Sequence, residues 1–160
     1  MTRLRLLVLV LALASGWGAA GAAATQERRL VVELPFADPG MRGAMSRARA
    51  ELPSFYDRLA YPASDEGEFM VAYDAIPGKA EELVWIDGIV RSGQSITGVV
   101  RTEVQRARVD TGDRVTIASA RILDWAYRKG KVMQGSYTTR VLISRMSSDE
   151  SFFLREYLGW

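Results

Sequence analysis

The residues best suited to chemistry lie together near the middle of the chain, in the run Asp124-Trp125-Ala126-Tyr127. If this run is extended, Trp125 and Tyr127 point to one face and Asp124 to the other. Aromatic faces beside a carboxylate can hold a sugar or a peptide, because rings bury apolar surface and carboxylates accept hydrogen bonds. The structural alternative places both rings in the core and has Asp124 cap a turn or accept backbone amides, which is the commoner use of such residues.

A second chemical group follows at Arg140, whose guanidinium could recognise a carboxylate or phosphate through two hydrogen bonds. A structural ion pair with Asp87, Asp113 or Asp124 is an equal alternative. We therefore take as candidate ligand-binding residues the aromatic and charged side chains of this region: Trp85, Asp87, Asp124, Trp125, Tyr127, Tyr137 and Arg140.

Catalysis has little support in the residue inventory. The chain contains no cysteine and no histidine, which excludes nucleophile systems built on Ser-His-Asp or Cys-His and excludes zinc and haem sites with His or Cys ligands. A carboxylate-dependent hydrolase would need two carboxyl groups at a fixed separation, and the sequence spacing of Asp87, Asp113 and Asp124 does not indicate one. The pair Gly112-Asp113 is typical of a turn and not of a phosphate loop. We expect no catalytic residue, no cofactor and no metal.

The first 24 residues have the three parts of a secretory signal. Arg3 and Arg5 precede an apolar run over residues 6–14, and small residues at positions 22–24 favour cleavage after Ala24. The apolar run is shorter than the roughly 20 residues that a spanning helix needs. We expect a periplasmic or secreted protein with no stable membrane anchor after cleavage.

Removing this signal also changes the charge balance. The formal charge of +2 falls to zero, because the removed part carries two arginines and no acidic residue. Nucleic-acid binding then loses its compositional support, since it needs a basic face. The partner we expect is a protein or a small ligand of the cell envelope, and the oligomeric state stays open.

The elements that must position these groups form one domain over residues 38–160, after a strand or linker at 25–37 with a short strand at 30–34. Asp38 and Pro39 favour a helix start, and apolar residues continue at helical spacing to Leu59. Pro53 predicts a kink or break after Leu52 and a short second helix. Alternating or β-branched residues predict strands at 68–75, 83–91, 96–101, 114–118, 122–127 and 137–143.

The remaining segments join these strands and close the chain. Residues 102–111 have little periodicity and are interpreted as a loop or a single helical turn. Ser147 and Glu150 match a capping box that opens a C-terminal helix, with Phe153, Leu154, Tyr157 and Leu158 facing the sheet and Gly159 ending the helix. The predicted fold is α+β, with N-terminal helices on a curved, mainly antiparallel sheet of about five strands and a short C-terminal helix.

Several of these motifs together resemble one family. The order of Gly112-Asp113, Asp124-Trp125 with Tyr127, and Tyr137-Thr138-Thr139-Arg140 is similar to the bacterial domain of unknown function 2314 family, as are the earlier residues Met41, Ala44, Ala48-Arg49, Leu52-Pro53, Phe55 and Val84-Trp85-Ile86-Asp87. The resemblance covers most of residues 38–142 and implies a compact α+β domain with no assigned activity. Ala126 stands where a larger apolar residue is usual, and the chain continues past Arg140 into a helix that the resemblance does not include.

The sequence thus predicts an exported domain that acts by binding. Two rival hypotheses stay open. An immunity-like inhibitor of a toxin or secreted enzyme is suggested by related bacterial families, and it would have one tight protein partner. A small carboxylate-dependent hydrolase would have a polar cleft with two close carboxylates, one with a raised pKa.

Overall fold

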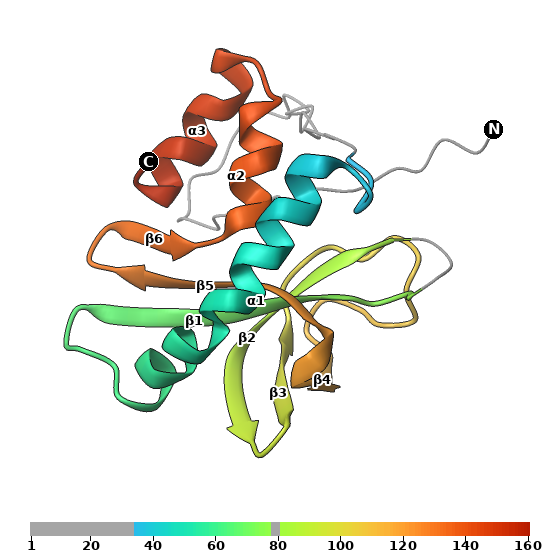
Figure 1. The fold of residues 1–160 in the computed structure, drawn as a ribbon, viewed down its shortest axis with the longest axis vertical. Helices are drawn as coiled ribbons and strands as arrows, with labels where there is room; N and C mark the ends of the chain where they lie inside the picture. Colours follow the sequence, from blue (N-terminus) through green and yellow to red (C-terminus); the bar gives the residue numbers. More distant parts are fainter. Residues whose placement is uncertain (1–33, 78–80) are drawn as a thin grey trace, which may run out of the picture.

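The computed structural model describes residues 34–77 and 81–160. The predicted signal at 1–24 and all but the last residue of the predicted strand at 30–34 lie outside these ranges. The elements follow one another as α1 (Pro39–Ala60), β1 (Glu66–Asp74), β2 (Leu83–Ser92), β3 (Ser95–Val100), β4 (Arg114–Ala118), the 3₁₀ turn η1 (Ser119–Arg121), β5 (Ile122–Lys129), β6 (Val132–Gly135), α2 (Tyr137–Ser144) and α3 (Ser148–Leu158). This confirms the predicted α+β class (Figure 1).

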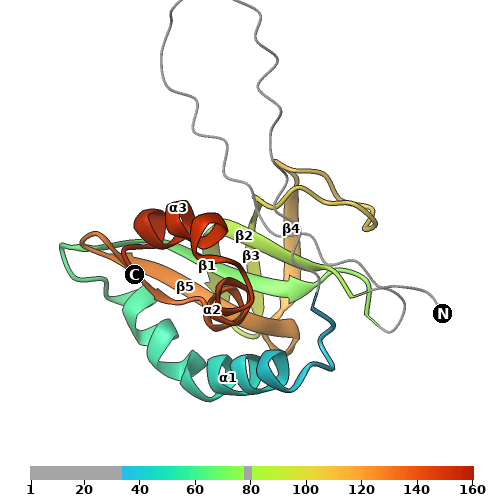
Figure 2. The ribbon, with the colours of Figure 1, turned by 90° about the horizontal axis from the view of Figure 1, so that it is seen from above.

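One sheet of six strands in the order β4-β3-β2-β1-β5-β6 forms the centre of the domain, and each pairing is antiparallel. Viewed from above, α1 lies on one face of the sheet and α3 on the other, with α2 between them beside β5 (Figure 2). The first face holds Phe55 of α1 against Val71, Ile86 and Trp125. The second holds Leu158 of α3 with Ala72 and Trp85. Both faces are therefore partly covered, and the sheet carries two apolar clusters.

Helix α1 begins as the sequence predicts. The Asp38 carboxylate accepts the amides of Gly40 and Met41 at 2.8 and 3.2 Å, and Pro39 occupies the first turn. Of the predicted kink or break at Pro53, the break and the short second helix are wrong, because one helix runs to Ala60 with Pro53 inside it. Pro53 is exposed, while Ala48 and Phe55 on either side of it are buried in the same cluster. Packing of both halves on one sheet face thus outweighs the local cost of the proline.

The predicted strand at 137–143 is also wrong, since these residues form helix α2. The β-branched residues Thr138, Thr139 and Val141 favour a strand locally. However, Gly135 and Ser136 have φ angles of 70° and 52°, which end β6 and turn the chain away from the sheet. Strand β6, which the sequence analysis did not predict, occupies the edge position instead.

The predicted start and end of the C-terminal helix are confirmed. Ser147 and Glu150 form a reciprocal capping box, and Gly159 closes α3 with a left-handed conformation. Leu154, Tyr157 and Leu158 join the apolar cluster on this face, whereas Phe153 is 75% exposed and does not face the sheet. No helix in the described part of the chain is long and apolar enough to cross a membrane.

Candidate functional site

The central aromatic residues lie between the sheet and α1. Trp125 is 6% exposed, stacks on Phe55 with ring centroids 5.2 Å apart, and donates its indole N–H to the Ala48 carbonyl at 2.9 Å. Tyr127 is half-buried and stacks on Phe69 at 5.3 Å. These contacts give Trp125 a role in joining α1 to β5, as in the structural alternative weighed above.

Asp124 points to the opposite face and is fully buried. Its carboxylate accepts the backbone amides of Trp125, Tyr137 and Thr138 and the hydroxyl of Thr138, at 2.8, 3.2, 2.8 and 2.5 Å. Ser136 stands at the N-cap position of α2 but makes no capping hydrogen bond there. The first turn of α2 is therefore capped by a side chain from β5.

Burial sets the protonation of this carboxyl. Desolvation raises the pKa of Asp124 to about 6, although its four hydrogen bonds act in the opposite direction. A raised pKa is one mark of a functional carboxyl. Here the cause of the raised pKa is burial, and the carboxyl already accepts four donors from the protein, which indicates a structural role.

Trp85 and Asp87 lie elsewhere on the sheet. Trp85 is buried on the α3 face, on the same side as Asp124 but separated from it by Ala72 of β1. Asp87 is half-buried and forms an ion pair with Arg101 at 2.5 Å. These two residues therefore do not join Trp125 and Tyr127 in one surface.

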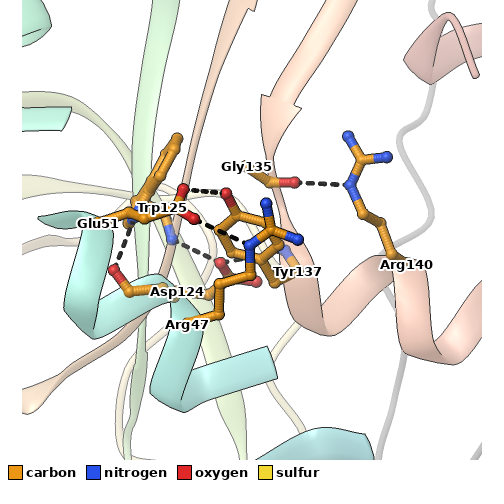
Figure 3. A network of polar contacts seen from close by, with 8 residues as sticks. Arg47, Glu51, Asp124, Trp125, Gly135, Tyr137 and Arg140 are labelled. Atoms are coloured by element: carbon orange, nitrogen blue, oxygen red, sulfur yellow. Dashed lines mark hydrogen bonds and ion pairs between the residues drawn. The ribbon is translucent and has the colours of Figure 1, made fainter. Parts of the chain in front are cut away.

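Tyr137 is the first residue of α2, is half-buried, and lies beside Arg47 and Glu51 of α1 (Figure 3). Its hydroxyl donates to the Glu51 carboxylate, the Arg47 guanidinium lies over its ring at 4.5 Å, and Trp125 meets it edge-on at 5.6 Å. Burial and the Glu51 carboxylate raise the pKa of Tyr137 to about 12. Hydrogen bonds from Tyr137 and Arg47 lower the pKa of Glu51. The phenol thus stays protonated and the carboxylate ionised at neutral pH.

Arg140 lies one turn further along α2 and is exposed. It donates from Nε to the Gly135 carbonyl at 3.0 Å and from Nη2 to the Met133 carbonyl at 3.2 Å, and it stacks on Trp160 at 3.7 Å. Within the described ranges it pairs with none of the aspartates weighed above. Burial, and then the nearby charge of Arg47, lower the pKa of Arg140.

Two residues that contact Tyr137 were not among the candidate residues predicted from the sequence. Arg47 and Glu51 are one helical turn apart and form an ion pair at 2.9 Å. Their spacing alone is typical of any solvated helix face, so the sequence offers no signal that links them to Tyr137. We call Arg47, Glu51, Tyr137 and Arg140 the arginine surface; Figure 3 shows Arg140 directed toward Gly135, apart from the other three.

Glu82 was missed as well. It is 7% exposed, and its carboxylate accepts the backbone amides of Gln105, Arg106 and Ala107 at 2.6, 3.1 and 2.7 Å. These contacts hold the loop at 102–111, which the sequence analysis interpreted as a loop or a single turn. The sequence gives no signal for this role, since it shows only two adjacent glutamates before a predicted strand.

No set of three or more acidic side chains in the described ranges is placed to hold a metal ion. Asp124 and Glu82, the acidic residues among the buried residues of the described ranges, both accept backbone amides. The arrangement can therefore offer guanidinium groups and aromatic rings to a ligand more readily than it can offer an acid and a base.

A family model described as an uncharacterized protein conserved in bacteria (DUF2314) matches residues 38–159. The match extends past Arg140 to the end of α3, so this helix lies inside the family domain. The prediction from the sequence, which placed the helix outside the resemblance, is wrong on this point. Comparison with curated proteins and with solved structures found no match.

Proposed function

Since the chain belongs to the uncharacterized bacterial family DUF2314, we propose that it is an exported, non-catalytic binding module that recognises a carboxylate-bearing segment of a protein partner. Arg47 and Arg140 of the arginine surface would bind the carboxylates, and Tyr137 would contact the chain that carries them. Of the seven candidate residues, Tyr137 and Arg140 are the two that this proposal keeps at the contact, while Trp125 and Asp124 support them from below.

The observation that carries the proposal is the placement of two guanidinium groups over aromatic rings. Arg47 lies over Tyr137 at 4.5 Å, and Arg140 lies over Trp160 at 3.7 Å. Stacking orients a guanidinium and lowers the entropy lost when it binds a planar anion. Nη1 of Arg140 has no hydrogen-bond partner among the described residues, and 65% of the Arg47 side chain is exposed.

Electrostatics around this pair favour an anion. The charge of Arg47 contributes to lowering the pKa of Arg140, which means that the two cations repel each other in the free protein. A bound carboxylate would relieve this repulsion. Helix α1 also exposes four arginines, Arg42, Arg47, Arg49 and Arg58, against the exposed Asp57 and the partly exposed Glu51, which is already paired with Arg47.

The rival hypotheses differ in how well this geometry supports them. An immunity-like inhibitor is a special case of the same proposal, with one tight acidic protein as the partner. A carboxylate-dependent hydrolase is less well supported, because Asp124 is surrounded by its four donors and Asp87 is paired with Arg101.

Export can be tested separately from binding. We propose that the chain is cleaved after Ala24 and accumulates in the periplasm or outside the cell. Mass spectrometry of the chain from fractionated cells should give a mass that lacks the first 24 residues. The full-length mass in the cytoplasmic fraction would contradict this part of the proposal.

Binding is tested by calorimetric titration with an eight-residue glutamate peptide as the probe. The expected result is binding that weakens with added salt, that is absent for an eight-residue glutamine peptide, and that falls at least tenfold in the double variant Arg47→Gln, Arg140→Gln. The matched control is Arg106→Gln, Arg108→Gln, which removes two exposed arginines from the loop at 102–111 and should bind as the unmodified chain does. Equal loss in both double variants would mean that net charge alone attracts the peptide, and the proposal would be wrong.

A further inference from the structure

The two edges of the sheet differ in a way that bears on assembly. We propose that the outer edge of β4 pairs with the same strand of a second copy of this chain, antiparallel and centred on Thr116. This inference concerns a surface away from the arginine surface and does not depend on the proposed ligand.

The register of β4 identifies the groups that face outward. Val100 donates its amide to the Asp113 carbonyl and Ser119 donates to the Gln94 carbonyl, so residues 113, 115, 117 and 119 direct their peptide groups toward β3. The alternating residues Arg114, Thr116 and Ala118 therefore direct their N–H and C=O groups away from the sheet. The Ala118 carbonyl is the N-cap carbonyl of η1 and accepts within that 3₁₀ turn. In the described ranges, no hydrogen bond reaches the Ala118 amide or the outward peptide groups of Arg114 and Thr116.

The opposite edge is blocked. On β6, the Met133 carbonyl accepts from the Trp160 indole at 2.8 Å and from Arg140 at 3.2 Å, and the Gly135 carbonyl accepts from Arg140 at 3.0 Å. Side chains that cover an edge in this way prevent another strand from adding to it. Because β4 has no such cover among the described residues, it is the edge at which a strand can add.

The sequence of β4 suits pairing with itself. A two-fold axis through Thr116 sets Arg114 opposite Ala118 of the second copy and Thr116 opposite Thr116. The two Thr116 residues would exchange two hydrogen bonds, and each Ala118 amide would donate to the Arg114 carbonyl of the other copy. The two arginines do not face each other. On the other face, Val115 and Ile117 of the two copies meet and extend the apolar cluster that already contains them.

The polar face adds a second match. Thr97 and Thr116 already share a hydrogen bond of 2.8 Å across β3 and β4, and Thr116 is exposed. Pairing at the axis would continue this threonine ladder through both copies. Two five-residue strands bury less than the roughly 1,200 Å² typical of a stable complex, so the dimer should dissociate at micromolar concentration.

The test uses sedimentation of the chain purified after expression from its full-length sequence, over a range of concentrations. The unmodified chain should change from monomer to dimer as concentration rises. Thr116→Lys and Thr116→Glu each place like charges opposite each other at the axis, so each should raise the dissociation constant at least tenfold. An equimolar mixture of the two variants should restore the dimer, because Lys then faces Glu.

The matched control is Val132→Lys, which places the same charge on the blocked edge strand β6 and should dimerise as the unmodified chain does. Circular dichroism and thermal melting check that each variant is folded. A chain that is monomeric at every concentration would overturn the inference, and so would a dimer that survives Thr116→Lys or a mixture that stays monomeric. Glutamate-peptide binding by Thr116→Lys should be unchanged, which separates failure of this inference from failure of the proposed function.

Discussion

The backbone amide of Thr138 lies 2.8 Å from the carboxylate of Asp124, a residue 14 positions earlier in the chain. This contact joins the middle of β5 to the first turn of α2. It explains how a run with three consecutive β-branched or aromatic positions begins a helix, because the amides that a strand would direct to a neighbouring strand are accepted by one buried side chain. The fold of the C-terminal third therefore depends on Asp124.

We expect Asp124→Ala to lower the free energy of unfolding by about 3 kcal/mol or more, since each buried donor left without a partner costs about 1–3 kcal/mol. Urea denaturation measures this change. Ser136→Ala is the control, because Ser136 stands at the N-cap position without making a capping bond. It should cost less than about 1 kcal/mol. A larger cost for Ser136→Ala than for Asp124→Ala would contradict the assignment.

The same carboxyl gives the domain a pH dependence. Its pKa is raised from 3.8 in an unfolded chain to about 6 in the fold. Between these pH values the folded chain holds a proton that the unfolded chain releases, so the free energy of unfolding should fall as pH rises from about 4 to about 6. At about 1.4 kcal/mol per pKa unit, the fall is about 3 kcal/mol.

Urea denaturation at pH 5 and pH 7 compares the chain with Asp124→Asn, which has no proton to release. The decrease between these pH values should be smaller in the variant. Equal decreases in both proteins would refute the raised pKa. Glu51 and Glu66 have lowered pKa values, so their protonation reduces the free energy of unfolding at pH below about 4.5. That range lies outside the interval from pH 5 to pH 7 used in this measurement.

Glu82→Gln should release the loop at 102–111 while leaving the sheet intact. The carboxylate accepts three consecutive amides, and a neutral amide oxygen accepts them more weakly. Hydrogen exchange at Gln105, Arg106 and Ala107 should accelerate at least tenfold, with little change at β5 amides. Acceleration spread evenly over the domain would instead indicate that Glu82 supports the whole fold.

Pro53→Ala should raise the free energy of unfolding by about 2 kcal/mol. Alanine restores an amide inside α1 and removes a cost of about 3 kcal/mol for proline in a helix interior. Part of this gain, about 0.4–1 kcal/mol, is lost because the unfolded chain becomes less restricted. Thermal denaturation measures the net effect. A lower melting temperature would mean that the proline fits the helix of the folded chain without strain.

The sequence was informative where structure is decided locally. Asp38, Pro39, the Ser147 and Glu150 pair and Gly159 correctly predicted helix ends, since a cap is a contact between near neighbours. The strands at 83–91 and 114–118 were predicted to within a residue because period-two alternation is a property of the strand itself.

The predictions of secondary structure were wrong where contacts between residues distant in the sequence determine the local structure. Pro53 breaks an isolated helix, but packing on the sheet keeps α1 continuous. Residues 137–143 favour a strand by composition, but Asp124 and the left-handed Ser136 make them a helix. The contacts of the candidate site could not be predicted from the sequence for the same reason. Arg47 and Glu51 lie 86 or more residues from Tyr137 in sequence, and no spacing rule connects them.

We propose that Arg47, over Tyr137, and Arg140, over Trp160, bind a carboxylate-bearing chain. The most direct measurement is a two-dimensional ¹H–¹⁵N NMR titration of the folded chain with the eight-residue glutamate peptide. We expect saturable shifts confined to the arginine side chains and to amides around residues 47–51 and 137–140, and we expect these shifts to disappear in Arg47→Gln, Arg140→Gln. Shifts centred elsewhere, or shifts that persist in that variant, would contradict it.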